Sequence, residues 1–151
     1  MWIEKDLSKA QMIRPSVSAV IFDGEGRVLL QRRTDNGQWG LPGGSVEIGE
    51  SVKAAIVREV QEETGLTVEV ARLVGVYSDP SFQVVAYPDG RVVHYVNICL
   101  ECHITGGALT TSAETLEVGF FPGTALPEPF VPLHRIRVQD ALAREEHAFI
   151  R

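Results

Sequence analysis

Three glutamates, Glu59, Glu62 and Glu63, stand close together in a segment whose pattern predicts a helix. The helix is expected from about Glu50 to Thr64, because good helix formers fill it and Gly65 follows it. At about 100° per residue, Glu59 falls within the apolar stripe, and the other two glutamates fall to either side. Carboxylates crowded at the edge of a core need protons or cations, so this spacing predicts a site for a hard divalent cation, Mg²⁺ or Mn²⁺.

A short loop rich in glycine, Leu41-Pro42-Gly43-Gly44, precedes the helix. Two residues without side chains would let the backbone approach a phosphate or a metal ion closely. Ser45 or Glu47 can start the helix that follows. The loop and the helix therefore form one candidate site.

The stretch from Gly44 to Leu66 resembles the signature of Nudix hydrolases, G-x5-E-x7-R-E-U-x-E-E-x-G-U, where U is aliphatic. Every fixed position is filled; the invariant places are taken by Gly44, Glu50, Arg58, Glu59, Glu62, Glu63 and Gly65, and the aliphatic ones by Val60 and Leu66. An ordinary amphipathic helix with a solvated acidic face explains the pattern less well, because Glu59 lies within the apolar stripe.

The resemblance implies hydrolysis of a nucleoside diphosphate linked to another group, by attack of water on one phosphorus. It assigns Glu62 and Glu63 as the main metal ligands and the Gly43 carbonyl as a backbone ligand. Glu59 matches a position that acts as ligand or base in different members of the family. The identity of the general base is left open.

Arg58 lies four residues before Glu62, a spacing at which the two side chains can pair on a helix. We therefore interpret Arg58 and Glu50 as organisers of the carboxylates. The catalytic candidates are Glu59, Glu62 and Arg58, and the structural organisers are Gly44, Glu50 and Gly65.

Residues outside the signature are weaker candidates. Arg33, and after it Arg32, ends a predicted strand where members of the family often contact substrate phosphates, although a pair of solvated charges is an equal alternative. Glu114 and Glu117 lie where some members carry an additional acid, but a surface acid is the usual explanation. Pro80 resembles a marker of members that cleave ADP-ribose, and it can also simply end a strand.

The predicted function is metal-dependent cleavage of the diphosphate linkage of a nucleoside diphosphate derivative, ADP-ribose or a nucleotide sugar. The first alternative is a nucleoside triphosphate pyrophosphohydrolase that removes unwanted nucleotides. An alternative of another class is a Nudix-like module that senses a nucleotide without cleaving it. Such modules usually lose carboxylates of the signature, whereas this chain keeps all of them.

The composition indicates one globular domain over residues 1–151, with 44% hydrophobic and 23% charged residues. The net charge of −6 argues against a nucleic-acid polymer as partner. A small nucleotide remains compatible, because a bound metal ion reverses the local field. The first residues lack the apolar region of a signal peptide, and no run is long enough to cross a bilayer, which predicts a cytoplasmic protein without a membrane partner. A homodimer is common in the resembled family.

The segment Cys99-Leu100-Glu101-Cys102-His103 matches the pattern of covalent haem attachment. Because its surroundings have the composition of a β-strand, alternation would place the two cysteines on opposite faces. We therefore predict a structural role for both.

The periodicity supports a mixed α and β protein, and the resemblance implies an α/β/α sandwich with a mixed sheet. Strand patterns pair into two predicted hairpins, and a further helix is expected near the end of the chain. These segments are Ser16–Phe22 with Val28–Gln31, Gln83–Tyr87 with Val92–Ile104, the intervening strand or strands Leu66–Tyr77, and the helix Leu133–Glu146.

Overall fold

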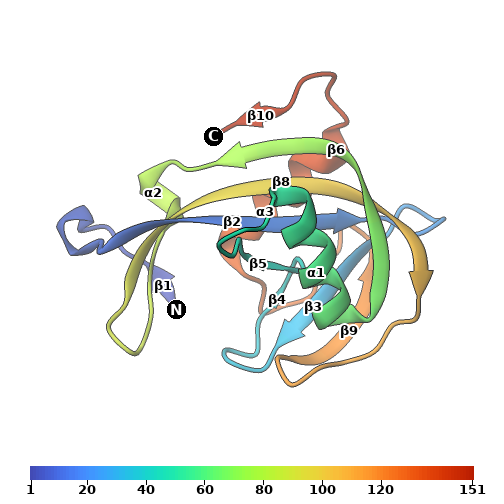
Figure 1. Cartoon of the computed structure of the whole chain (residues 1–151), viewed down its shortest axis with the longest axis horizontal. Helices are drawn as coiled ribbons and strands as arrows, with labels where there is room; N and C mark the ends of the chain where they lie inside the picture. The colour runs from blue at the N-terminus through green and yellow to red at the C-terminus, as the bar shows by residue number, and fades with distance from the viewer.

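A long central strand, β8 (Val92–Gly107), organises the larger of two sheets in the computed structural model, which describes residues 1–151 (Figure 1). It runs parallel to β2 and antiparallel to β6 and β7. The sheet is therefore mixed. Its other strands are β1 (Trp2–Ile3), β2 (Met12–Ile21), β5 (Gly43–Ser45), β6 (Leu66–Tyr77), β7 (Val84–Ala86) and β10 (Phe149–Ile150).

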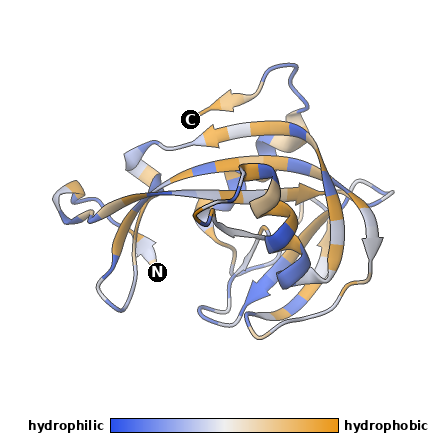
Figure 2. Cartoon of the chain, in the orientation of Figure 1, coloured by the Kyte–Doolittle hydropathy of each residue, from blue (hydrophilic) through white to orange (hydrophobic).

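Two helices cover the opposite faces of this sheet, α1 (Val52–Thr64) and α3 (Pro132–Ala143). Because successive side chains of β2 point to opposite faces of the sheet, Ala19 and Ile21 lie in the core beneath α1 and Val20 lies in the core beneath α3. Figure 2 shows hydrophilic segments on α1 beside the hydrophobic strands that it covers. The α/β/α sandwich expected from the resemblance is confirmed. None of the helices is long and apolar enough to cross a membrane.

The two cysteines follow the same alternation on β8. Cys99 is buried in the core on the α3 side and Cys102 in the core on the α1 side. Both are free thiols, and burial raises the pKa of each. The prediction of opposite faces is confirmed, and the arrangement prevents the two sulfurs from joining in one disulfide or one haem linkage.

A smaller sheet contains β4 (Trp39–Gly40), β3 (Val28–Arg33) and β9 (Thr115–Phe121). The first predicted hairpin is therefore wrong in its pairing. The turn after β2 forms, with Asp23 accepting the Arg27 backbone N–H at 2.9 Å, but only Phe22 and Val28 bridge the two strands. Beyond the turn, β3 pairs with β4 and β9 instead of β2, and both faces of β3 are buried. The sequence pattern of the two strands does not show which strands lie beside β3.

The second predicted hairpin is confirmed, with β7 and β8 joined through the turn that contains Gly90. The two helix boundaries differ from expectation. Helix α1 begins only after Ser51, whose hydroxyl accepts the Ala54 backbone N–H at 3.0 Å. Helix α3 ends at Ala143, because Arg144 adopts a left-handed conformation that turns the chain back toward β10.

Gly65 ends α1 with a φ of 79°, a left-handed conformation that disfavours any side chain. A Cβ atom there would also lie 2.5 Å from Thr110 Cγ2. We expect Gly65→Ala to lower the free energy of unfolding by about 2–3 kcal/mol, as measured by urea denaturation. Gly24→Ala is the matched control, because a Cβ there meets no atom within 4 Å, and an equal loss in both variants would contradict the assignment.

Candidate active site

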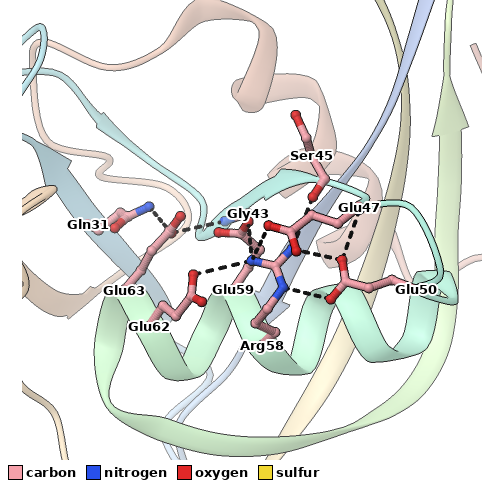
Figure 3. A network of polar contacts seen from close by, with 9 residues as sticks. All are labelled: Gln31, Gly43, Ser45, Glu47, Glu50, Arg58, Glu59, Glu62 and Glu63. Atoms are coloured by element: carbon pink, nitrogen blue, oxygen red, sulfur yellow. Dashed lines mark hydrogen bonds and ion pairs between the residues drawn. The ribbon is translucent and has the colours of Figure 1, made fainter.

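A single guanidinium, that of Arg58, lies among the carboxylates of α1 and of the loop before it (Figure 3). It donates to Glu50 from Nε at 2.6 Å and from Nη2 at 2.9 Å. Its Nη1 donates to Glu59 at 2.9 Å and to Glu62 at 3.2 Å, and Nη2 reaches the Ser45 carbonyl at 3.2 Å. The structure thus brings the two predicted organisers Arg58 and Glu50 together with Glu59 and Glu62.

The electrostatics follow from these contacts. The hydrogen bond with Arg58 lowers the pKa of Glu50 to about 2, and the hydrogen bond with Glu50 raises the pKa of Arg58. Arg58 supplies one positive charge against the carboxylates of Glu50, Glu59 and Glu62. The network as a whole therefore stays negative and attracts further positive charge.

Glu63 is the most buried of the three glutamates, with 5% of its surface exposed. The sequence pattern places Glu59 within the apolar stripe and Glu63 beside it. Glu63 Oε2 accepts a hydrogen bond from the Gln31 side-chain amide and another from the Gly43 backbone N–H, the latter at 3.1 Å. Burial, and then the neighbouring Glu59, raise the pKa of Glu63 well above its ordinary range. Two adjacent carboxylates at this depth need a shared proton or a bound cation.

The two glycines of the loop are required by close packing. A Cβ at Gly44 would lie 2.6 Å from Cδ of Glu59, and one at Gly43 would lie 2.9 Å from Cα of Ser18 on β2. Only glycine therefore allows β5 to pack against both α1 and β2. The role of the Gly43 carbonyl as a metal ligand stays a prediction.

A cavity of about 260 Å³ opens beside these residues. Its wall includes Gly43, Gly44, Glu59 and Glu63 from the predicted site, together with Arg33 and Glu114. The rest of the wall comes from elements far away in the sequence, including Gln83, Tyr87, Tyr95, Asn97, His134 and Arg137. Sequence reasoning missed this second group, because no local motif marks residues that only the fold brings to one cavity.

The two arginines predicted as weaker candidates, Arg33 and Arg32, differ in their position relative to the cavity. Arg33 lines the cavity and donates to Asp35 from Nε at 2.9 Å and from Nη2 at 2.8 Å. Arg32 does not line it; its Nε donates to the Gly37 carbonyl at 3.0 Å, and its Nη1 lies 3.9 Å from Glu117. Of the two arginines, therefore, Arg33 faces the cavity and Arg32 does not.

Pro80 has a structural place in the fold. It is the first residue of the short helix α2 (Pro80–Gln83), and the Asp79 side chain accepts the Ser81 backbone N–H at 2.8 Å as the cap of that helix. Pro80 does not line the cavity, whereas Gln83 at the other end of α2 does.

The donor set suits a hard divalent cation, because carboxylate oxygens are the ligands that Mg²⁺ and Mn²⁺ prefer. No three His, Cys, Asp or Glu side chains lie close enough together in the structure to form a metal site. Glu59 and Glu62 instead accept hydrogen bonds from Arg58, and the Glu62 side chain is 59% exposed. Glu59 and Glu63 lie one helical turn apart and both line the cavity, and Glu63 is 5% exposed; two carboxylates at this depth fit a bound cation.

Comparison with known proteins agrees with this geometry. A family model described as NUDIX domain matches residues 12–145. A MutT-like protein of Streptomyces ambofaciens is 37% identical over 127 residues, which cover 84% of this chain and 75% of that protein. An ADP-ribose pyrophosphatase of Methanocaldococcus jannaschii is 38% identical over 130 residues, covering 83% and 73%. The crystal structure of an ADP-ribose pyrophosphatase from Streptococcus suis is 28% identical, covers 91% of this chain and 97% of its own, and has a TM-score of 0.69.

Proposed function

The chain belongs to the NUDIX family of hydrolases, and from this premise we propose that it cleaves the diphosphate linkage of a nucleoside diphosphate derivative, ADP-ribose or a nucleotide sugar. The observation that carries the proposal is the cavity that joins Glu59 and Glu63 to Arg33. A diphosphate presents negative oxygens to both a cation site and a guanidinium, and this wall offers the two together. The names of the related pyrophosphatases support the same substrate class.

We propose that Glu59, Glu62 and Glu63 hold a divalent cation, Mg²⁺ or Mn²⁺, with the Gly43 carbonyl. When bound, such a cation screens the diphosphate and lowers the pKa of the attacking water. Arg58 keeps Glu59 and Glu62 in place through the hydrogen bonds of its Nη1. Arg33 binds a phosphate oxygen of the substrate, with its guanidinium oriented by Asp35.

Product analysis tests this function. Purified protein is incubated with Mg²⁺ and with ADP-ribose, nucleotide sugars, dinucleoside polyphosphates and nucleoside triphosphates, and the products are separated by chromatography. AMP and ribose 5-phosphate are the products expected from ADP-ribose. A nucleoside monophosphate with pyrophosphate would instead identify a triphosphate pyrophosphohydrolase. No cleavage of any compound with Mg²⁺ or Mn²⁺ would contradict the proposal and favour the non-catalytic sensor.

Glu63 gives the metal-free protein a specific pH dependence. Its pKa is raised in the folded state, so the fold keeps a proton that the unfolded chain releases above the ordinary value of 4.5. This contribution to stability is complete below that pH and is lost as the pH rises toward the raised pKa. In EDTA, we expect the free energy of unfolding of the wild type to fall more steeply with pH than that of Glu63→Gln, by up to about 1.4 kcal/mol per pH unit between about pH 5 and 7.

Urea denaturation at a series of pH values measures this difference in slope. The exposed Glu69 provides the matched control, since Glu69→Gln should keep the slope of the wild type. Titration of Mg²⁺ at neutral pH in buffers of different ionisation enthalpy should also show that a proton is released on binding. Equal slopes for the wild type and Glu63→Gln would show that Glu63 is already ionised without a metal ion.

A single domain, a cytoplasmic location and a homodimer stay predictions from the sequence and the family. Size-exclusion chromatography with light scattering measures the oligomeric state directly. A monomer in that measurement would remove the predicted homodimer without affecting the proposed reaction, because the cavity described above is lined within one chain.

A further inference from the structure

The buried guanidinium of Arg137 lacks a negative partner. Arg137 lies on α3, is 2% exposed and lines the cavity. Its Nη2 donates to Gln83 Oε1 at 2.9 Å, whereas its Nε has no hydrogen-bond partner. The guanidinium also lies 5.5 Å from the centre of the Tyr77 ring, a contact with no formal negative charge. Leaving a charged donor buried and unpaired is costly, so such a group indicates a partner that arrives from outside the chain.

Outside the predicted metal site, the buried carboxylates of the protein are compensated. Glu101 lies 3.3 Å from Arg72, and the Asp140 carboxylate accepts from Arg151 at 2.9 Å. No carboxylate lies within 4.0 Å of Arg137. Burial lowers the pKa of Arg137 to about 10, a value at which it still carries its charge at neutral pH. Arg137 is therefore the buried cation of this fold whose counter-ion is missing.

A second donor lies one helical turn away on the same face of α3. His134 Nδ1 accepts the Leu41 backbone N–H at 3.0 Å, which leaves the proton of the neutral ring on Nε2. His134 also lines the cavity, and burial lowers its pKa well below the ordinary value. A neutral imidazole with Nε2–H donates to an acceptor oxygen, and it adds no positive charge of its own.

Most other polar side chains at this end of the cavity already satisfy each other. Asn97 accepts from the Ser18 hydroxyl at 2.8 Å and donates to the Ser16 hydroxyl at 2.9 Å. The hydroxyls of Tyr87 and Tyr95 share a hydrogen bond of 2.6 Å. Arg137 and His134 therefore stand out as donors available to a bound group.

We propose that Arg137 and His134 form an anion subsite in this cavity, and that the preferred substrate is a nucleoside diphosphate derivative carrying a phosphate or carboxylate in addition to its diphosphate. The inference rests on the proposed hydrolase function, because it assumes that the diphosphate occupies the part of the same cavity near Glu59 and Glu63. A guanidinium binds both kinds of anion through parallel hydrogen bonds, so the shared chemistry is an oxyanion.

Two matched pairs of compounds test the subsite. UDP-glucose and UDP-glucuronate differ by a carboxylate on the sugar, and ADP-ribose and ADP-ribose 2′-phosphate differ by a phosphate on the nucleoside. Dissociation constants are measured by calorimetry in EDTA, where no metal-dependent turnover occurs, and kcat/KM is measured with Mg²⁺. We expect the wild type to prefer the more anionic member of at least one pair by roughly 10- to 100-fold.

Arg137→Gln should abolish this preference, so that the ratio between the two members of the pair is about one. Arg137→Lys keeps the charge without the planar guanidinium and should give an intermediate ratio. Arg135→Gln is the matched control on the same helix. The Arg135 side chain is 42% exposed and pairs with Glu128 at 2.9 Å outside the cavity, so its variant should keep the ratio of the wild type. The pair that shows the preference identifies whether the anion is a sugar carboxylate or a nucleoside phosphate.

The results separate the two proposals. Absence of preference in both pairs for the wild type, or a preference that persists in Arg137→Gln, overturns the subsite even if all four compounds are cleaved. No cleavage of any compound contradicts the hydrolase function, while the binding ratios in EDTA still decide the subsite. Because the comparison within the wild type is informative alone, the test does not depend on the folding of either Arg137 variant.

Discussion

Replacing Glu62 by glutamine is expected to lower kcat/KM by roughly 100- to 1000-fold without unfolding the protein. The Glu62 side chain is 59% exposed, and its contact in the structure is the 3.2 Å hydrogen bond from Arg58. Glutamine keeps the size of the side chain but removes the charge that a hard divalent cation requires. Activity should therefore fall while the free energy of unfolding changes by less than about 0.5 kcal/mol.

Steady-state kinetics at saturating Mg²⁺ and urea denaturation check the two parts of this expectation. Glu69→Gln provides the matched control, because Glu69 is another exposed glutamate, on β6 and outside the cavity wall. It should keep the activity of the wild type. Activity in Glu62→Gln equal to that of the control would remove Glu62 from the site and leave Glu59 and Glu63 as the carboxylates of α1 proposed to hold the cation.

The part of the site that could be predicted from the sequence is the part formed by neighbours along one helix. Arg58 and Glu62 are four positions apart, so helical geometry alone brings their side chains together. The hydrogen bond from Arg58 to Glu62 follows from that spacing. The same local argument correctly predicted the opposite orientations of Cys99 and Cys102 along β8.

The parts that could not be predicted depend on contacts between distant segments. Gln31 from β3 reaches Glu63 because the second sheet packs beside α1, and no pattern around Gln31 indicates this partner. Arg137 and His134 lie on α3, a helix whose sequence contains no motif. Their chemistry becomes visible only when the fold shows which buried donors lack partners.

One error in secondary structure has the same origin, and another has a local cause. The turn signal after β2 is a local pattern and predicts pairing between β2 and β3. In the structure β3 lies where its two faces are buried in two different cores, and this position depends on distant segments. The sequence predicts the start of α1 too early, because Glu50 has good helix propensity. In the structure Glu50 instead turns toward Arg58, and the hydroxyl of Ser51 caps the helix.

Replacing Arg58 by methionine should weaken both the fold and the reaction. Methionine keeps much of the length and leaves the carboxylates of Glu50, Glu59 and Glu62 without the cation that they share. Arg58 is 24% exposed and Glu50 16%, so the lost hydrogen bonds are partly shielded from water. We expect the free energy of unfolding to fall by about 2–3 kcal/mol and kcat/KM to fall by about 100-fold.

Arg58→Lys distinguishes a positioning role from a purely structural one. An ammonium keeps the charge but cannot reach Glu50 and Glu59 in parallel, so the carboxylates lose their orientation while the local charge is retained. The Mg²⁺ concentration for half-maximal activity should therefore rise in this variant. Arg91→Met is the control, because Arg91 and Asp89 form an exposed pair on a turn, and exposed pairs contribute little to stability. Unchanged Mg²⁺ dependence in Arg58→Lys would show that Arg58 supports the helix without orienting the ligands.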